Sequence, residues 1–375
     1  MDYAERYRQL KTVFPNDMNE VSIPGSGVRI CKQDFVSEEP DDFFYISDDA
    51  GINENRVFSY PVFIPADRNS NKVILLLHGL NERSWIKYLA WAHYISEFTG
   101  SYVILFPISF HMNRSPEEWS NPRTMSLQLG ERVAAGGNIQ MASFANVALS
   151  KRLSDDPRRF FISGYRTACD ITRLLDSVTR GEHTVIPATR NFNVFSYSIG
   201  SFLSEILFMA NPQNLFSESK LFIFCGGSVF SRMQGTSKLI MDSLAFDRVF
   251  RFYLYDFEGA IGTGQIAGFF NINRLGLAFR SMIDIEKMKD YREKILRELR
   301  NRITAISLLK DRVIPPGGII ETLDCFNEGR IVSLADFPYD YSHENPFPVH
   351  SDPGIMKKVN DCFEWVMGKA VEALA

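Results

Sequence analysis

The sequence predicts an α/β protein in which a mostly parallel sheet is covered by helices. Several apolar runs are continuous rather than alternating, which is typical of strands buried on both faces of a parallel sheet. They lie at 72–79 (KVILLLHG), 101–109 (SYVILFPIS), 191–196 (NFNVFS) and 220–227 (KLFIFCGG). A segment with helical spacing, 83–100, joins the first two and stops at a glycine. Strand, helix and strand in this order form the unit of a parallel α/β sheet.

The C-terminal quarter continues this pattern. Residues 302–310 and 330–337 are strand-like, and a short helix at 319–327 is expected between them. The chain closes with an amphipathic helix, for which Asp352 is the expected cap and Pro353 the first helical residue.

Two alternating segments near the N-terminus predict a hairpin. Residues 42–47 and 57–65 carry β-favouring residues, and the turn cluster DDAGINEN lies between them. Residues 110–160 are rich in turn residues and small side chains, and we expect an irregular insertion over one end of the sheet.

Composition excludes several classes of function. The 375 residues include 41 basic and 45 acidic side chains, a formal charge of −4, which argues against a nucleic-acid surface and a polybasic membrane patch. Five widely spaced cysteines without a C-x-x-C pair suggest neither a zinc ribbon nor a redox pair. Cys225, inside a strand-like run, is expected to be a buried free thiol.

The sequence predicts a cytoplasmic protein. Its N-terminus has no apolar stretch before a small-residue cleavage site, as a secretory leader would. No window reaches the roughly 18 apolar residues of a membrane span. Neither a nucleic acid nor a membrane span is therefore expected.

Ser198 is the candidate nucleophile. It stands in S-Y-S-I-G between a strand and a helix, and a sharp turn there lifts the hydroxyl off the sheet. The turn is crowded, so the residues two before and two after must be small, which Ser196 and Gly200 satisfy. The alternative is that Ser198 only caps the following helix.

Two backbone N–H groups are candidate donors to an oxyanion. One belongs to Ile199, directly after the nucleophile, and the other to Leu80, in the loop that follows the first long strand. In the same loop, the side chain of His78 is expected to fix the loop and to have no role in the chemistry.

Asp311 and His343 are the candidate acid and base. Asp311 follows the strand at 302–310 and precedes a proline-bounded turn, although aspartate is also common in ordinary turns. His343 follows the next strand, and His350 is the second choice for the base. The order Ser, Asp, His across successive strand ends favours a catalytic role.

These motifs together resemble the α/β-hydrolase family. The resemblance rests on HG after the first long strand, S-Y-S-I-G, D-R-V-I-P after a late strand, and S-H-E-N-P before the last helix. It implies a three-layer α/β/α sandwich with about eight mostly parallel strands and a catalytic triad at their carboxyl ends. It also implies acyl transfer through a covalent acyl-enzyme, with a small-molecule or acyl substrate, no metal and no organic cofactor. Ser196 departs from the family pattern, which has glycine there.

The resemblance also implies a domain organisation. Residues 1–42 are expected to form an N-terminal extension, and 43–228 with 301–375 the hydrolase core, including the insertion near 110–160. Residues 229–300 are the expected helical cap. The cap is rich in phenylalanine, which favours an apolar acyl pocket, although the same residues are as readily core.

Other functions stay open. GAIGTGQIAG at 259–268, after a possible strand at 251–257, resembles a dinucleotide loop, and Asp284 lies at a suitable distance. The hydrolase fold without catalysis would serve as a binding or interaction protein. An acyltransferase or a peptidase would use the same triad as an esterase.

Overall fold

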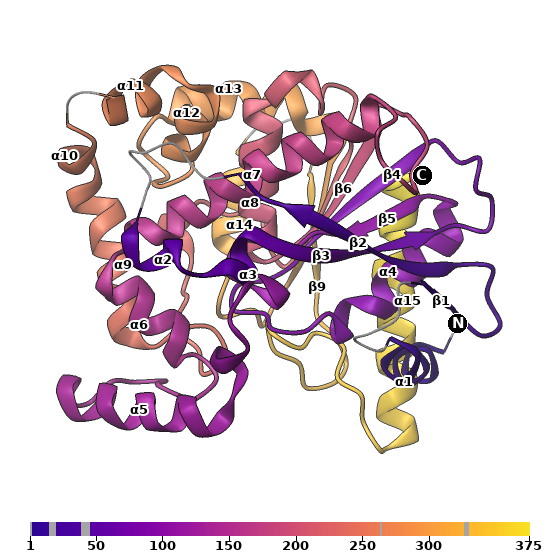
Figure 1. Ribbon diagram of the computed structural model, residues 1–375, viewed down its shortest axis with the longest axis horizontal. Helices are drawn as coiled ribbons and strands as arrows, with labels where there is room; N and C mark the ends of the chain where they lie inside the picture. The colour runs from indigo at the N-terminus through magenta and orange to yellow at the C-terminus, as the bar shows by residue number, and fades with distance from the viewer. Residues whose placement is uncertain (1, 15–19, 39–45, 263–264, 326–329) are drawn as a thin grey trace.

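One sheet of nine strands lies at the centre of the protein in the part of the chain that the computed structural model describes. That part comprises residues 2–14, 20–38, 46–262, 265–325 and 330–375. The strand order is β1-β2-β3-β5-β4-β6-β7-β8-β9 (Figure 1). The predicted mostly parallel α/β architecture is confirmed, with one strand more than the expected eight or so.

Six neighbouring strands are parallel and correspond to the six predicted runs. They are β4 (Lys72–Leu77), β5 (Tyr102–Leu105), β6 (Asn191–Tyr197), β7 (Leu221–Phe224), β8 (Ile303–Leu308) and β9 (Val332–Ala335). β5 and β7 are buried along their whole length, as continuous apolar runs require. The antiparallel strands are β1 (Glu20–Ser22), β2 (Arg29–Val36) and β3 (Val57–Ile64).

Helices cover both faces of the sheet and make three layers. One face carries α1 (Tyr3–Val13), α4 (Ile86–Thr99) and α15 (Pro353–Leu374). The other carries α7 (Arg158–Thr179), α8 (Ile199–Ala210) and α14 (Pro316–Leu323). Alternate strand residues enter the two cores: Leu75 faces α7 and α8, whereas Leu76 faces α4. Asp352 caps α15 and Pro353 opens it, as predicted.

Most of the remaining helices gather at one end of the sheet, on the left and at the top left of Figure 1. They are η2 (Met112–Arg114), η3 (Glu117–Ser120), α5 (Pro122–Gly136), α6 (Val147–Asp155), η5 (Phe230–Arg232), α9 (Ser243–Arg251), the π-helical η6 (Phe252–Asp256), α10 (Phe257–Ile261), α11 (Gln265–Ile272), α12 (Arg274–Ser281) and α13 (Lys289–Leu299). α6 packs on α9, and α12 packs on α8, so the two helical insertions contact each other and the core. The other short helices are α2 (Ser47–Ala50), which is also drawn on the left of Figure 1, α3 (Asn53–Arg56), η4 (Pro212–Asn214) and η7 (Arg300–Arg302).

The expectation of an irregular segment at 110–160 is wrong, because α5 and α6 occupy much of it. The start of α5 has a sequence signature: Asn121 accepts hydrogen bonds from Arg123 and Thr124, and Pro122 takes the first helical position. Gly130 and Gly136 lie inside α5, and their low helix propensity obscured the pattern.

The N-terminal segment differs from the expected peripheral extension. β1 and β2 lie within residues 1–42 and extend the sheet next to β3. The hairpin partner of β3 is β2, with Val36 opposite Val57 and Arg29 opposite Ile64. Of the segment expected to pair there, residues 42–45 lie outside the described part of the chain, and Ser47 begins α2.

The dinucleotide-loop alternative is also wrong. Residues 251–257, expected as its strand, are helical from α9 through η6 into α10. Gly264 of that motif lies outside the described residues. Without a strand before the glycines, the required strand-to-helix turn does not form.

Across the described ranges, no helix combines the length and the apolar character needed to cross a bilayer. Cys225 is a buried free thiol, as the sequence predicted.

Candidate active site

Four loops meet at the carboxyl ends of the parallel strands. They follow β4, β6, β8 and β9 and carry Leu80, Ser198, Asp311 and His343, respectively. Carboxyl ends of parallel neighbours share one edge of the sheet, so residues far apart in sequence are brought together there.

Ser198 occupies a strained turn between β6 and α8. Its φ of 58° and ψ of −126° lie in a region that residues other than glycine rarely adopt, at a typical cost of about 1–3 kcal/mol. The backbone passes so close to the end of β4 that a Cβ on Gly200 would lie 2.7 Å from the carbonyl oxygen of Leu77 and 2.8 Å from that of His78. The requirement for glycine at this position is therefore steric.

Ser196 takes the place where the family pattern has glycine without disturbing the turn. It is buried, and its hydroxyl donates to the carbonyl of Phe222 on β7 at 3.3 Å. A buried hydroxyl needs such a partner, and the neighbouring strand supplies it. The departure from the family pattern is thus accommodated within the sheet.

Three of the predicted side chains form one hydrogen-bonded chain. Ser198 Oγ lies 2.7 Å from His343 Nε2, and His343 Nδ1 lies 2.7 Å from Asp311 Oδ2. The other carboxylate oxygen, Oδ1, accepts from the backbone N–H groups of Val313 and Ile314, each at 2.9 Å. The three residues are each 4% exposed, so their hydrogen bonds lie in a water-poor setting.

The loop that carries His343 is held from two sides. The hydroxyl of Tyr197 donates to the His343 carbonyl, and the two rings stack with centroids 5.6 Å apart. Lys87 Nζ donates to the carbonyl of Glu344 at 3.1 Å. His350, the second choice for the base, is exposed next to α15, where its Nδ1 accepts from the N–H of Asp352. It is His343 that faces Ser198.

His78 fixes the loop after β4, as the sequence indicated. Its Nε2 accepts from the N–H of Ile108 at 2.9 Å, so Nδ1 carries the proton and donates to the Gly79 carbonyl at 2.8 Å. Burial lowers the pKa of His78 to about 3, so the ring is neutral.

Asn81 ties the same loop to both helical insertions. Its side-chain amide donates to the carbonyls of Ala145, at 2.9 Å, and Leu239, at 2.8 Å. The residue adopts φ 61°, which asparagine tolerates better than most residues. These bonds hold Leu80 at the junction of three cavities.

The residues of the two candidate oxyanion donors line the same cavity as the nucleophile. Ile199 is the first residue of α8, and the first N–H groups of a helix have no acceptor within it. Leu80 and Ile199 line a small cavity together with Ser198, here termed the nucleophile cavity. Met233, Met241 and Phe246 of the second insertion cover it.

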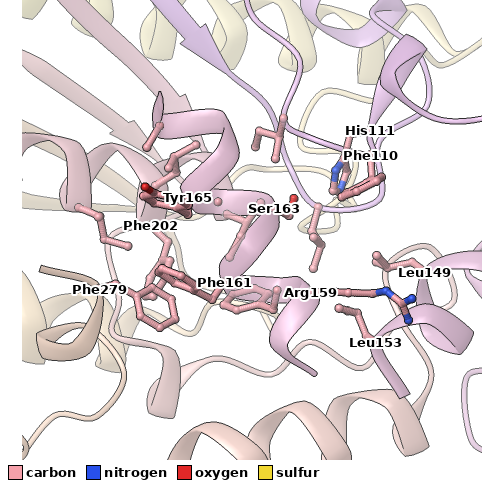
Figure 2. A pocket seen from close by; sticks show the side chains of 18 of the residues that line it. Phe110, His111, Leu149, Leu153, Arg159, Phe161, Ser163, Tyr165, Phe202 and Phe279 are labelled. Carbon is pink, nitrogen blue, oxygen red and sulfur yellow. The ribbon is translucent and has the colours of Figure 1, made fainter. Parts of the chain in front are cut away.

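A larger apolar cavity, here termed the deep cavity, shares Leu80, Phe160 and Ile199 with the nucleophile cavity. Its volume is about 790 Å³ including the space open at its mouth. Figure 2 shows its extent along α7, from Phe202 and Phe279 at one end to Phe110 and His111 at the other. Three phenylalanines of the expected cap, Phe230, Phe246 and Phe279, line these cavities, whereas Phe257 and Phe270 pack together in the core.

A family comparison covers nearly the whole of this architecture. Residues 44–375 match the model of a family of unknown function, DUF6051. The chain belongs to the DUF6051 family. No curated protein matches the sequence.

Solved structures similar to this DUF6051 protein are hydrolases by their names. An acylaminoacyl peptidase from Pyrococcus horikoshii is 13% identical, with a TM-score of 0.42. The match covers 90% of this chain and 41% of the peptidase, so this chain spans less than half the length of the peptidase. Carboxyl esterase 2 from Tuber melanosporum is 10% identical, with a TM-score of 0.44. The match covers 100% of this chain and 97% of the esterase. A thermostable esterase from Pseudomonas putida is 9% identical, with a TM-score of 0.44. The match covers 100% of this chain and 89% of the esterase. At these identities and TM-scores, the likenesses add nothing about this chain to the three-layer α/β sandwich that its own topology shows.

Sequence reasoning missed the residues that hold this site in place. Tyr197 directly precedes the nucleophile, and Asn81 directly follows Leu80, so both stood inside recognised motifs. Their hydrogen-bond partners lie far away in the sequence, and no local sequence pattern predicts these contacts. No cluster of three or more potential metal-binding side chains occurs in the parts of the chain that the structure describes.

Proposed function

We propose that this DUF6051 protein is a serine hydrolase that cleaves an ester-type acyl bond, with Ser198 as nucleophile, His343 as general base and Asp311 as the acid that orients it. The observation that carries the proposal is the continuous hydrogen-bonded chain from Ser198 Oγ through both ring nitrogens of His343 to Asp311. A serine hydroxyl becomes a nucleophile when such an oriented base accepts its proton.

The first step is proton transfer with attack on the acyl carbon. Asp311 Oδ2 accepts a hydrogen bond, so the His343 proton resides on Nδ1 and Nε2 offers a lone pair to the Ser198 hydroxyl. As Oγ bonds to the carbonyl carbon, Nε2 takes the proton and the carbonyl oxygen becomes an oxyanion. The N–H groups of Leu80 and Ile199 donate to that oxygen.

The remaining steps complete a two-stage displacement. The imidazolium returns its proton to the leaving alcohol as the bond to the acyl carbon breaks, which leaves an acyl ester on Ser198. Water then attacks this ester and gives a proton to Nε2. The bond between Ser198 Oγ and the acyl carbon breaks, the imidazolium returns the proton to Oγ, and the acid leaves. Each stage returns His343 to its neutral form next to the Asp311 carboxylate.

The deep cavity suits an apolar acyl chain. It begins at the two oxyanion donors and is lined mainly by apolar and aromatic side chains. Each buried methylene contributes about 0.8 kcal/mol, so kcat/KM is expected to rise with acyl length until the cavity is filled. Hydrolysis of p-nitrophenyl esters from acetate to decanoate measures this trend, and highest activity on acetate would contradict an acyl role for the cavity.

Ester hydrolysis by the wild type and by Ser198→Ala tests the proposed chemistry itself. The substitution removes the nucleophile while keeping a small residue in the turn, and a loss of at least about 10³-fold in kcat is expected. Thermal unfolding of both proteins shows whether the variant is folded. Equal activity in a folded Ser198→Ala variant would remove Ser198 from the mechanism.

A further inference from the structure

A second, more polar pocket opens next to the proposed oxyanion loop. The loop after β4, from Leu80 to Ser84, forms one wall of it, and Trp119, Phe144 and Glu344 stand on the others. Leu80 is shared with the deep cavity and the nucleophile cavity. The polar pocket therefore meets the apolar cavities at Leu80, and it is also lined by Glu344, which directly follows His343.

Arg83 is the unusual residue of the polar pocket. Its Nη2 donates to Asn81 Oδ1 at 3.1 Å, and its guanidinium carbon lies 5.4 Å from the centre of the Trp119 ring. Its Nε and Nη1 are buried, with no hydrogen-bond partner among the described residues. Nitrogen atoms of a guanidinium in this situation have lost water and gained no acceptor.

The charged groups around Arg83 do not neutralise its positive charge. Arg152 lies on the same Trp119 ring, 4.6 Å from its centre, but Arg152 and Arg159 share the carboxylate of Asp49, each at 3.0 Å. Arg83 makes no ion pair with a carboxylate within the described ranges. Burial, and then the charge of Arg152, lower the pKa of Arg83 to about 10, which leaves it a cation at neutral pH.

The two carboxylates that line the polar pocket are engaged elsewhere. Glu82 accepts from Lys87 and from the Tyr88 hydroxyl. Glu344 accepts from the Ser237 hydroxyl and directly follows His343. The end of the polar pocket formed by Arg83 and Trp119 is therefore positive. The end formed by Glu344 is the one next to His343, the proposed base.

We propose that the polar pocket binds an anionic group, a carboxylate or a phosphate, carried by the leaving group of the substrate, and that Arg83 is the cation that selects it. This inference rests on the proposed hydrolase function. The apolar cavities take the acyl chain, so the alcohol portion extends past Leu80 into the polar pocket. There an anion neutralises a charge that the folded chain leaves unpaired, in surroundings where water screens it weakly.

A matched pair of esters tests the selection. One is the butyryl ester of 4-hydroxybenzoate, and the other that of 4-hydroxybenzamide, which has nearly the same shape and no charge. The amide withdraws electrons more strongly, so chemistry alone favours the neutral ester. We expect the wild type to prefer the anionic ester in kcat/KM by about 10- to 100-fold, the range of a charged hydrogen bond. The butyryl ester of 4-hydroxyphenyl phosphate shows which anion is preferred.

Arg83 variants assign the preference to this residue. Arg83→Met is expected to abolish the preference, and Arg83→Lys to retain part of it. Arg302→Gln is the matched control: Arg302 is also desolvated, but it bonds to the carbonyls of Phe216 and Ser219 at the opposite end of the sheet, and its substitution should leave the preference unchanged. No preference in the wild type, or an equal preference in Arg83→Met, would overturn the proposal.

Binding separates this proposal from the proposed reaction. The Ser198→Ala variant lacks the proposed nucleophile, so it is expected not to hydrolyse either ester. Calorimetric titration of this variant with the anionic and the neutral ester therefore measures binding alone. Tighter binding of the anionic ester, lost in the Ser198→Ala, Arg83→Met double variant, supports the anion site even if the wild type hydrolyses neither ester. A melting temperature far below that of the wild type in both Arg83→Met and Arg83→Lys would make Arg83 a structural residue and contradict the proposal.

Discussion

At the scale of single residues, the account depends on which atom of His343 faces which partner. Asp311 Oδ2 lies against Nδ1, and Ser198 Oγ lies against Nε2, each at 2.7 Å. Val313 and Ile314 hold the other Asp311 oxygen, so the carboxylate cannot turn away without breaking two bonds. One carboxylate thereby fixes the tautomer that the proposed mechanism requires.

Asp311→Asn is expected to lower kcat by about 10⁴-fold with little change in fold. The amide presents an NH₂ group to Nδ1, which moves the imidazole proton to Nε2 and removes the acceptor for the Ser198 proton. Steady-state kinetics on a p-nitrophenyl ester, alongside near-ultraviolet circular dichroism, measures both effects. Activity within about tenfold of the wild type would be incompatible with an orienting role for Asp311.

At the scale of elements, the turn between β6 and α8 depends on its closeness to β4. A Cβ at Gly200 would meet two backbone carbonyls at the end of β4, and backbone atoms cannot move aside cheaply. Ser196 makes its contact in the opposite direction, to β7. The strained conformation of Ser198 is therefore imposed by the strands on either side of β6.

Gly200→Ala is expected to destabilise the fold by about 1–3 kcal/mol and to reduce activity, because the turn must shift away from the Leu80 loop. Gly368→Ala is the matched control: Gly368 lies in α15 with nothing within 4 Å of the added Cβ, and alanine there should stabilise the helix by about 0.5–1 kcal/mol. Urea denaturation of both variants compares them, and similar stabilities would show that the turn has room for a side chain.

The sequence was sufficient to predict the elements that carry local signals. Each of the six parallel strands has a strand-like sequence pattern, and Ser198, Asp311 and His343 each follow such a strand, so their meeting was predictable from topology. β1 and β2 were missed because their pairing with β3 is a long-range choice that composition does not reveal. Asn81 and Tyr197 were missed as positioning residues because their bonding partners lie 64 and 146 residues away.

At the scale of the whole molecule, two helical insertions enclose a site built on the core sheet. α5 and α6 come from one insertion and α9 to α13 from the other, and Figure 1 shows them together at one end of the sheet. Asn81 contacts both insertions through the two hydrogen bonds that its side-chain amide donates. The same helices make the deep cavity and the polar pocket, so we propose that substrate choice resides in the insertions and chemistry in the core.

Acid sensitivity of the whole fold is expected from its buried histidines, of which His78 is the clearest. Its pKa is lowered to about 3 by burial, against about 6.5 in the unfolded chain. Between these values the unfolded chain binds the extra proton, so the stabilisation is complete above pH 6.5 and is lost as pH falls toward 3. His78 alone should contribute a loss of about 2 kcal/mol at pH 5.

Denaturant titrations at pH 7.5 and pH 5 measure this loss. The free energy of unfolding of the wild type should fall between the two, and that of His78→Gln should fall by about 2 kcal/mol less. Equal decreases in the two proteins would mean that His78 does not titrate as its burial requires.

Labelling with a fluorophosphonate probe reports whether Ser198 is an activated nucleophile, as the proposed function requires. The wild type and Ser198→Ala are incubated with the probe and analysed by intact mass and by peptide mapping. We expect one adduct on the wild type, located at Ser198, and none on the variant. A folded wild type that stays unlabelled, or one that is labelled at another residue, would contradict this expectation.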